Sequence, residues 1–224
     1  MSTILEYHTK GKYDLSTNFF YGIQNKLFNQ NSIGMYPRQA CEIALKYGDP
    51  IYDDCPGNYE IPNCRPVAEK AFNNAETMTK AADFKVKAYY VCNKDEDIKY
   101  ALVNYGPILG SIKWYKQYNI DKDGVLIKKP NATWESRHAI VIYGYNEKGW
   151  LCQNSWGVLW GKRGKFILPY GSHGMEARGL IDMENETYIA PPKKNKFMNI
   201  FYKYFINICV NVATEIFSWF KKKN

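Results

Sequence analysis

The chain has 224 residues, of which 46% are hydrophobic and 16% aromatic, so it can bury a core and is not a disordered polymer. Its net charge is +8, but the seven lysines and one glutamate after residue 192 contribute +6 and leave only +2 on the rest. Because nucleic-acid-binding domains spread Lys and Arg over a folded face, we expect no nucleic-acid partner.

The first half of the chain carries apolar residues at helical spacing, separated by polar turns. Pro37 suits the first turn of a helix, and Gly48 and Gly106 are typical of residues just past a helix end. We therefore expect helices near residues 2–7, 14–28, 36–48 and 92–107.

The second half changes to short segments rich in β-branched and aromatic residues, bounded by Gly, Asn, Asp and Pro. This composition favours an antiparallel sheet or small barrel. The segments are 84–91, 108–115, 124–127, 138–145, 150–156 and 165–170. A helical half followed by a strand-rich half indicates an α+β fold of two lobes with a cleft between them.

These changes in pattern also predict the organisation of the chain. We place a helical lobe at residues 1–85 and a β lobe at 86–190. The stretch 191–196, "PPKKNK", has the composition of a linker, and residues 197–220 are predicted to form a separate helix.

Six cysteines, at positions 41, 55, 64, 92, 152 and 209, are too few to define a disulfide framework. Cys55 and Cys64 flank a turn-rich stretch and could be bridged. There is no Cys-x-x-Cys pair and no Cys–His spacing typical of zinc sites. We therefore expect neither a metal nor another cofactor.

The strongest functional signal is the stretch 137–164, "RHAIVIYGYNEKGWLCQNSWGVLWGKRG". Its alternating apolar residues and the turn at 146–149 predict a hairpin that brings His138 beside Asn154. An imidazole acts as a base when its second nitrogen is held, and a neutral amide suits a thiol nucleophile better than a serine. Trp156 is expected to cover the His–Asn hydrogen bond from water.

These residues resemble motifs of the papain family of cysteine peptidases, peptidase family C1, in its bacterial and viral-type branch. Its His-Ala strand, Asn-Ser-Trp-Gly motif and Trp-Gly-x-x-Gly motif match residues 138–140, 154–157 and 160–164. Looser matches lie at 14–28, 34–50, 52–59 and 105–112, and the resemblance spans roughly residues 2–185.

The resemblance implies a papain-like two-lobe fold and a peptide or protein substrate. It implies a catalytic role for His138 and Asn154 and a supporting role for Trp156. It also suggests that the backbone of Gly34 pairs with an extended substrate. Arg137 departs from the small or acidic residue common before the histidine, and its charge is expected to oppose an imidazolium at position 138.

The family's nucleophile lies in a Gln-x-x-x-Cys-Gly-x-Cys-x-Ala segment at the start of its central helix, and residues 2–7 resemble the middle of that helix. We therefore expect this cysteine and glutamine a few residues before Met1, so that the helical lobe is N-terminally incomplete. We place Cys92 at the end of the preceding predicted strand, so none of the chain's own cysteines is expected to begin a helix, where the dipole favours a thiolate. Cys152 is instead expected to be a core residue of a strand.

Two functions follow. The first is a papain-like cysteine peptidase that cleaves peptide bonds through a Cys-His-Asn site and is incomplete in this chain because the nucleophile is absent. The alternative is an inactive pseudopeptidase, a membrane-held module that binds peptides or proteins without cutting them. Whether the chain acts as an enzyme is left open by its sequence.

The segment 197–220 would span about 36 Å as a helix, long enough to cross a bilayer. Its polar residues fall within one arc of roughly 160° at 100° per residue, and Lys203 and Glu215 oppose insertion. A helix lying at the membrane surface, a transmembrane anchor and a helix docked on protein remain alternatives. Membrane contact is favoured, so we expect a membrane-associated protein whose compartment the sequence does not indicate.

Overall fold

A computed structural model of the chain describes residues 1–28, 34–57 and 61–181. The predicted linker at 191–196 and the predicted helix at 197–220 lie outside these ranges. Within them, no helix is both long and apolar enough to cross a membrane. The helices are α1 Ser2–His8, α2 Thr17–Phe28, α3 Pro37–Lys46, α4 Ile61–Asn73, α5 Ala75–Ala81 and α6 Asp95–Tyr105, with short 3₁₀ turns at Tyr52–Asp54 and Ala82–Phe84.

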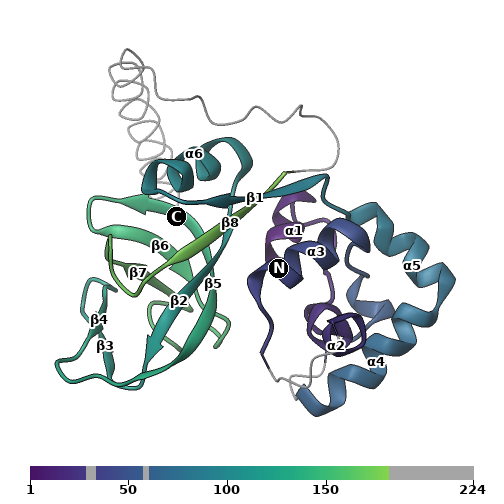
Figure 1. The fold of residues 1–224 in the computed structure, drawn as a ribbon, viewed down its shortest axis with the longest axis horizontal. Coiled ribbons are helices and arrows are strands. Elements are labelled where there is room, and N and C mark those ends of the chain that lie inside the picture. Colours follow the sequence, from purple (N-terminus) through teal and green to yellow (C-terminus); the bar gives the residue numbers. More distant parts are fainter. Residues whose placement is uncertain (29–33, 58–60, 182–224) are drawn as a thin grey trace, which may run out of the picture. The chain divides into compact units, whose positions relative to one another are not determined.

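Helices α1 to α5 form the helical lobe (Figure 1). Pro37 opens α3, as expected, and Gly48 follows its end with a φ of 78°, a conformation that favours glycine. Helices α2 and α4 pack closely because Gly22 has no side chain: a Cβ there would lie 2.7 Å from the carbonyl oxygen of Cys64 and would clash with Cβ of Ala68.

Two of these helices, α4 and α5, were not predicted individually. Helix α4 contains Pro66, and proline disfavours a helix interior. Packing against α2 outweighs that local preference. Helix α5 begins at an N-cap, where the side chain of Asn74 accepts hydrogen bonds from the backbone N–H groups of Glu76 and Thr77 at 3.0 and 3.1 Å.

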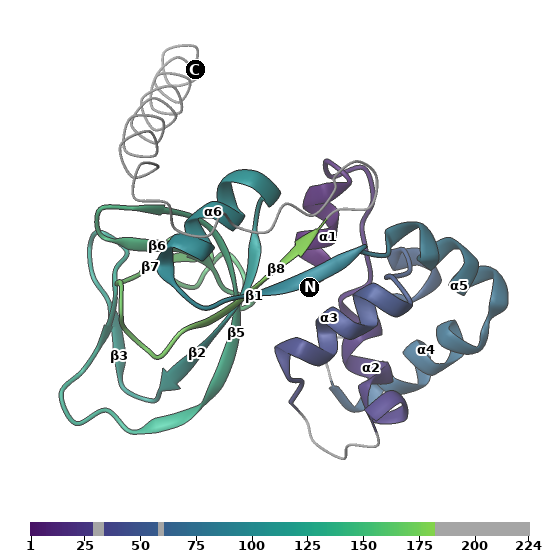
Figure 2. The same cartoon turned by 45° about the horizontal axis from the view of Figure 1, so that its top comes forward.

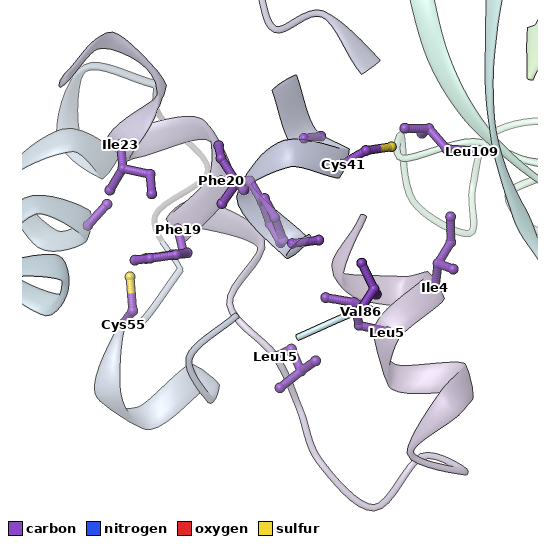
Figure 3. Close-up of a cluster of buried hydrophobic side chains, with 14 of the residues drawn as sticks. Ile4, Leu5, Leu15, Phe19, Phe20, Ile23, Cys41, Cys55, Val86 and Leu109 are labelled. Carbon is purple, nitrogen blue, oxygen red and sulfur yellow. The ribbon is translucent and has the colours of Figure 1, made fainter. Parts of the chain in front are cut away.

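The helical lobe has its own apolar core, drawn in Figure 3. Ile4, Phe19, Ile23 and Ile43 are among its fully buried residues. Leu109, from a strand of the β lobe, joins the same cluster, and Figure 3 shows the sulfur of Cys41 directed toward it. The two lobes therefore share apolar contacts through one face of the sheet.

The β lobe is built on an antiparallel sheet in the order β1-β8-β2-β5-β6-β7, with a separate pair β3-β4. Figures 1 and 2 show α6 lying against these strands. The bounds are β1 Ala88–Cys92, β2 Ile108–Tyr115, β3 Tyr118–Ile120, β4 Leu126–Lys128, β5 Trp134–Asn146, β6 Gly149–Gln153, β7 Lys165–Leu168 and β8 Glu176–Ile181. Strands β3 and β8 were not predicted.

Alternation along β2 and β5 separates two faces of this sheet. Leu109 in β2 and its partner Val141 in β5 contact the core of the helical lobe. Ile112 faces the other side with residues of a second apolar cluster, which belongs to the β lobe. Ile112 is also the cross-strand partner of His138. The arrangement confirms the predicted α+β class.

Candidate functional site

The predicted hairpin forms as strands β5 and β6, which pair in antiparallel register from Val141↔Gln153 to Asn146↔Gly149. The side-chain oxygen of Asn146 accepts the backbone N–H groups of Lys148 and Gly149 at 2.9 and 3.1 Å, which closes the turn. Asn154 follows β6 directly, and its backbone N–H donates to the carbonyl oxygen of Gly164 at 2.8 Å.

This hairpin brings His138 and Asn154 together. Nε2 of His138 lies 2.8 Å from Oδ1 of Asn154, a good hydrogen-bond distance. Asn154 is 5% exposed, so the bond is formed where water competes little.

A second contact identifies which nitrogen of His138 carries the proton. The backbone N–H of Ser155 lies 2.7 Å from the same Asn154 atom, and an N–H can only donate. That atom must therefore be the carboxamide oxygen, an acceptor, and Nε2 of His138 must be the donor. In the neutral ring the lone pair then lies on Nδ1, the nitrogen that can accept a proton.

Two indole rings contact the imidazole and each other. The Trp156 ring centroid lies 4.8 Å from that of His138 at an interplanar angle of 42°. The Trp114 ring lies 5.0 Å from His138 at 60°, and the two indoles are 5.0 Å apart. Trp156 is 45% exposed, whereas Trp114 is only 5% exposed.

Burial sets the basicity of this histidine. Removal from water lowers the pKa of His138, and the hydrogen bond to Asn154 partly opposes that shift. The ring is therefore neutral near pH 7, as a proton-accepting base requires.

Arg137 lies beside His138 in sequence, but its charge is paired on the opposite face of β5. Its guanidinium forms an ion pair with Glu176 at 3.1 Å. The same group donates to the hydroxyl and carbonyl oxygens of Ser111 at 3.0 and 2.9 Å. The expected opposition of Arg137 to an imidazolium is therefore offset by a carboxylate that sequence spacing did not reveal.

Comparison with known proteins decides the family. Residues 3–188 match the papain family cysteine protease pattern. The chain belongs to the papain family of cysteine proteases.

Relatives and solved structures agree with this membership. Cathepsin B-like cysteine proteinase 3 of Caenorhabditis elegans is 26% identical over 186 residues, covering 80% of this chain and 48% of the relative. The gut-specific cysteine proteinase of the same organism is 32% identical over 122 residues, covering 53% of this chain and 36% of the relative. This chain thus spans about half the length, or less, of these curated relatives.

The fold comparison gives the same answer. The crystal structure of xylellain, a cysteine protease from Xylella fastidiosa, matches with a TM-score of 0.68 at 18% identity, covering 82% of this chain and 77% of that one. This likeness confirms the predicted papain-like fold.

The described cysteines of this papain-family chain are all buried, and none of them forms a disulfide: Cys41, Cys55, Cys64, Cys92 and Cys152. Cys55 and Cys64, which could have been bridged, are therefore not joined by a disulfide. Burial raises the pKa of Cys41 and of Cys92 to about 12, and it raises the pKa of Cys152 as well. These thiols have neither the exposure nor the low pKa of a nucleophile.

The remaining site residues lie elsewhere. Gly34 is exposed in the segment before α3, and its role toward a substrate stays a prediction. In the described part of the chain, no group of three or more His, Cys, Asp or Glu side chains is placed to hold a metal ion. The residue that sequence reasoning missed is Trp114. Only its place in a predicted strand was visible, because its contact with His138 depends on strand pairing.

Proposed function

We propose that this chain supplies the base and the orienting amide of a cysteine peptidase site that hydrolyses peptide bonds in peptides or proteins. His138 acts as the general base, and Asn154 holds its ring. The nucleophile is a cysteine other than the five described ones. The observation that carries the proposal is the shared Asn154 oxygen, 2.8 Å from Nε2 of His138 and 2.7 Å from the N–H of Ser155.

The chemistry follows from the tautomer. Nδ1 of His138 takes the proton of the thiol, and the thiolate attacks the carbonyl carbon of the peptide bond. As the carbon–nitrogen bond breaks, the imidazolium returns that proton to the departing amine. Nδ1 then accepts a proton from water, whose oxygen attacks the thioester. The acid is released, and the proton returns to the thiol.

Asn154 supports both protonation states of His138. A carboxamide oxygen accepts the Nε2–H bond whether Nδ1 is protonated or not, so the ring need not turn during the cycle. Because the amide is neutral, the positive imidazolium is balanced by the thiolate rather than by a third charge. The exposed indole of Trp156 limits the access of water to this bond.

The test compares the full chain with the same chain extended upstream of Met1 by a helix-starting segment that contains Gln and Cys-Gly-x-Cys. The unextended chain should not cleave a fluorogenic peptide, because loss of a nucleophile alone lowers kcat by about 10⁶ in a serine peptidase. The extended chain should cleave it. Replacing the added cysteine by Ser, or His138 by Ala, should abolish cleavage.

Alkylation of the added cysteine supplies a second measurement that does not need turnover. If His138 activates it, iodoacetamide should modify that thiol faster at pH 6 in the extended chain than in its His138→Ala variant. Equal rates in a folded pair of proteins would contradict the proposal.

The burial of the described cysteines favours a second function, that of a pseudopeptidase. Since all five described thiols are buried, the chain alone suits a pseudopeptidase that binds extended peptides without cutting them. Calorimetric binding of a peptide that stays intact in the presence of the unextended chain would support this function. Loss of that binding in a folded Trp156→Ala variant would place the peptide beside His138.

We also propose that residues 197–220, outside the described residues, hold the protein at a membrane surface. Support comes only from the sequence, in which polar residues gather on one arc of the predicted helix and lysines stand at both ends.

A further inference from the structure

We propose that Trp114 is a positioning residue that holds the imidazole of His138 in the orientation needed by its hydrogen bond to Asn154. This inference rests on the proposed function, since it concerns the same base. Trp114 does not contact the reacting atoms itself; it acts through His138.

Strand pairing places Trp114 against the ring. Ile112 is opposite His138 in the β2–β5 pair, and Trp114 is opposite Ser136, so Trp114 and His138 are diagonal neighbours on one face. The register shifts just after Trp114. A bulge of this kind re-aims the side chains beside it, and here it accompanies an indole lying 5.0 Å from the imidazole.

Trp114 is itself held firmly. It is 5% exposed, and its ring lies 4.8 Å from that of Tyr118 and 6.1 Å from that of Trp160. The Nε1–H of Trp160 donates to the hydroxyl of Tyr118 at 3.0 Å, which joins these two neighbours. The imidazole of His138 therefore packs against an indole whose own position is held by its contacts with Tyr118 and Trp160.

Trp156 is less suited than Trp114 to hold the imidazole of His138 in place. Trp156 as a residue is 45% exposed, and it follows Asn154 in a loop rather than lying in a strand. Trp114 contacts both His138 and Trp156 at 5.0 Å between ring centroids. It therefore supports the imidazole directly and also supports the indole that covers it from solvent.

The expected consequence is that the imidazole of His138 keeps one orientation and one tautomer. If the imidazole rotated about its Cβ–Cγ bond, Nε2 would leave Asn154 and the proton could move to Nδ1, which would then no longer accept one. The indole of Trp114 packs against the imidazole, with ring centroids 5.0 Å apart at 60°, and in our proposal this contact opposes that rotation. Removing it should both admit water and release the ring.

The experiment follows the imidazole of His138 by NMR in the full 224-residue chain, using ¹⁵N-labelled histidine. The three histidine signals are assigned with single His→Gln variants. In the unmodified chain we expect one tautomer, protonated at Nε2, and contacts between the ring protons of His138 and Trp114. Trp114→Leu should give mixed tautomers and a pKa closer to 6.5, while Trp114→Phe should keep the single tautomer.

Trp150→Leu is the matched control. Trp150 is 1% exposed in the same apolar cluster, but its ring contacts are with Tyr145 and Tyr170. It should lower stability without changing the tautomer of His138.

Three results would overturn the proposal: an unchanged tautomer and pKa in folded Trp114→Leu, an equal change in Trp150→Leu, or no contact between the two rings in the unmodified chain. The last measurement decides the matter even if the Leu variant does not fold. Because these signals need no turnover, they are separate from the proposed function. That function fails instead if the extended chain with a normal His138 spectrum cleaves nothing.

Discussion

The carboxamide oxygen of Asn154 lies 2.8 Å from Nε2 of His138 and links strand β5 to the residue that directly follows strand β6. The same oxygen accepts the backbone N–H of Ser155. The backbone N–H of Ser155 thus determines which atom of Asn154 is the oxygen, and that oxygen determines which nitrogen of His138 carries the proton.

Asn154→Asp should raise the pKa of His138. A carboxylate at this buried position places a negative charge beside Nε2, which favours the imidazolium. NMR titration of histidine measures the change. Asn146→Asp is the control, since the side-chain oxygen of Asn146 accepts the two N–H groups of the β5–β6 turn and a carboxylate oxygen keeps those bonds. A pKa that rises equally in both variants would show a general charge effect instead.

Stability should depend on the protonation of His138. Burial lowers its folded-state pKa below the ordinary value of 6.5, so between these two pKa values the unfolded chain binds more protons than the folded chain. The free energy of unfolding therefore falls as pH drops through that window and is fully retained above it.

The variant that checks this is His138→Gln. Its melting temperature should fall less between pH 7.5 and pH 5 than that of the unmodified chain, because the variant lacks this proton uptake. Burial and the charge of Lys128 lower the pKa of His173 as well, so a His173→Gln variant should show the same sign. An identical decline in all three proteins would contradict the assignment.

Gly22→Ala should destabilise the helical lobe by about 1–3 kcal/mol, the usual range for overpacking. The new Cβ would lie 2.7 Å from the carbonyl oxygen of Cys64, so α2 and α4 must separate. Urea denaturation measures the loss. Gly34→Ala is the control, because among the described residues nothing beyond its chain neighbours lies within 4 Å of a Cβ there, and the substitution should be nearly neutral.

Thiol reagents should modify the described cysteines slowly in the native chain. Cys41, Cys92 and Cys152 are buried with raised pKa values, so little thiolate is available. Peptide mapping after iodoacetamide treatment, with and without urea, separates native from unfolded reactivity. Rapid native modification of Cys152 would make it a rival nucleophile and would contradict its place in the β-lobe core.

The tail should bind anionic vesicles through charge and an apolar face. Replacing Lys221, Lys222 and Lys223 by Glu in the full chain should reduce co-sedimentation with vesicles that contain phosphatidylserine, and high salt should weaken the binding of the unmodified chain. Binding that resists both salt and alkaline extraction would favour a transmembrane anchor.

Much of the fold could be read along the sequence. Helices α1, α2, α3 and α6 and most strands follow from local spacing, because their apolar residues repeat with the period of the element. Helix α4 could not be predicted in this way. Its proline favours a break, and only the close approach of Gly22 on α2 to Cys64 and Ala68 explains why the helix persists.

The candidate site likewise has features that the sequence predicted and features that only the tertiary structure revealed. By itself the sequence determined the papain-like α+β class. It also determined the pairing of His138 with Asn154, because these two residues belong to one hairpin whose register follows from its turn and its alternating apolar residues. Only the tertiary structure decided that Trp114 lies against the imidazole and that Glu176 neutralises Arg137. Those contacts join different strands, and which residues meet across a sheet depends on strand order and register, which no local pattern encodes.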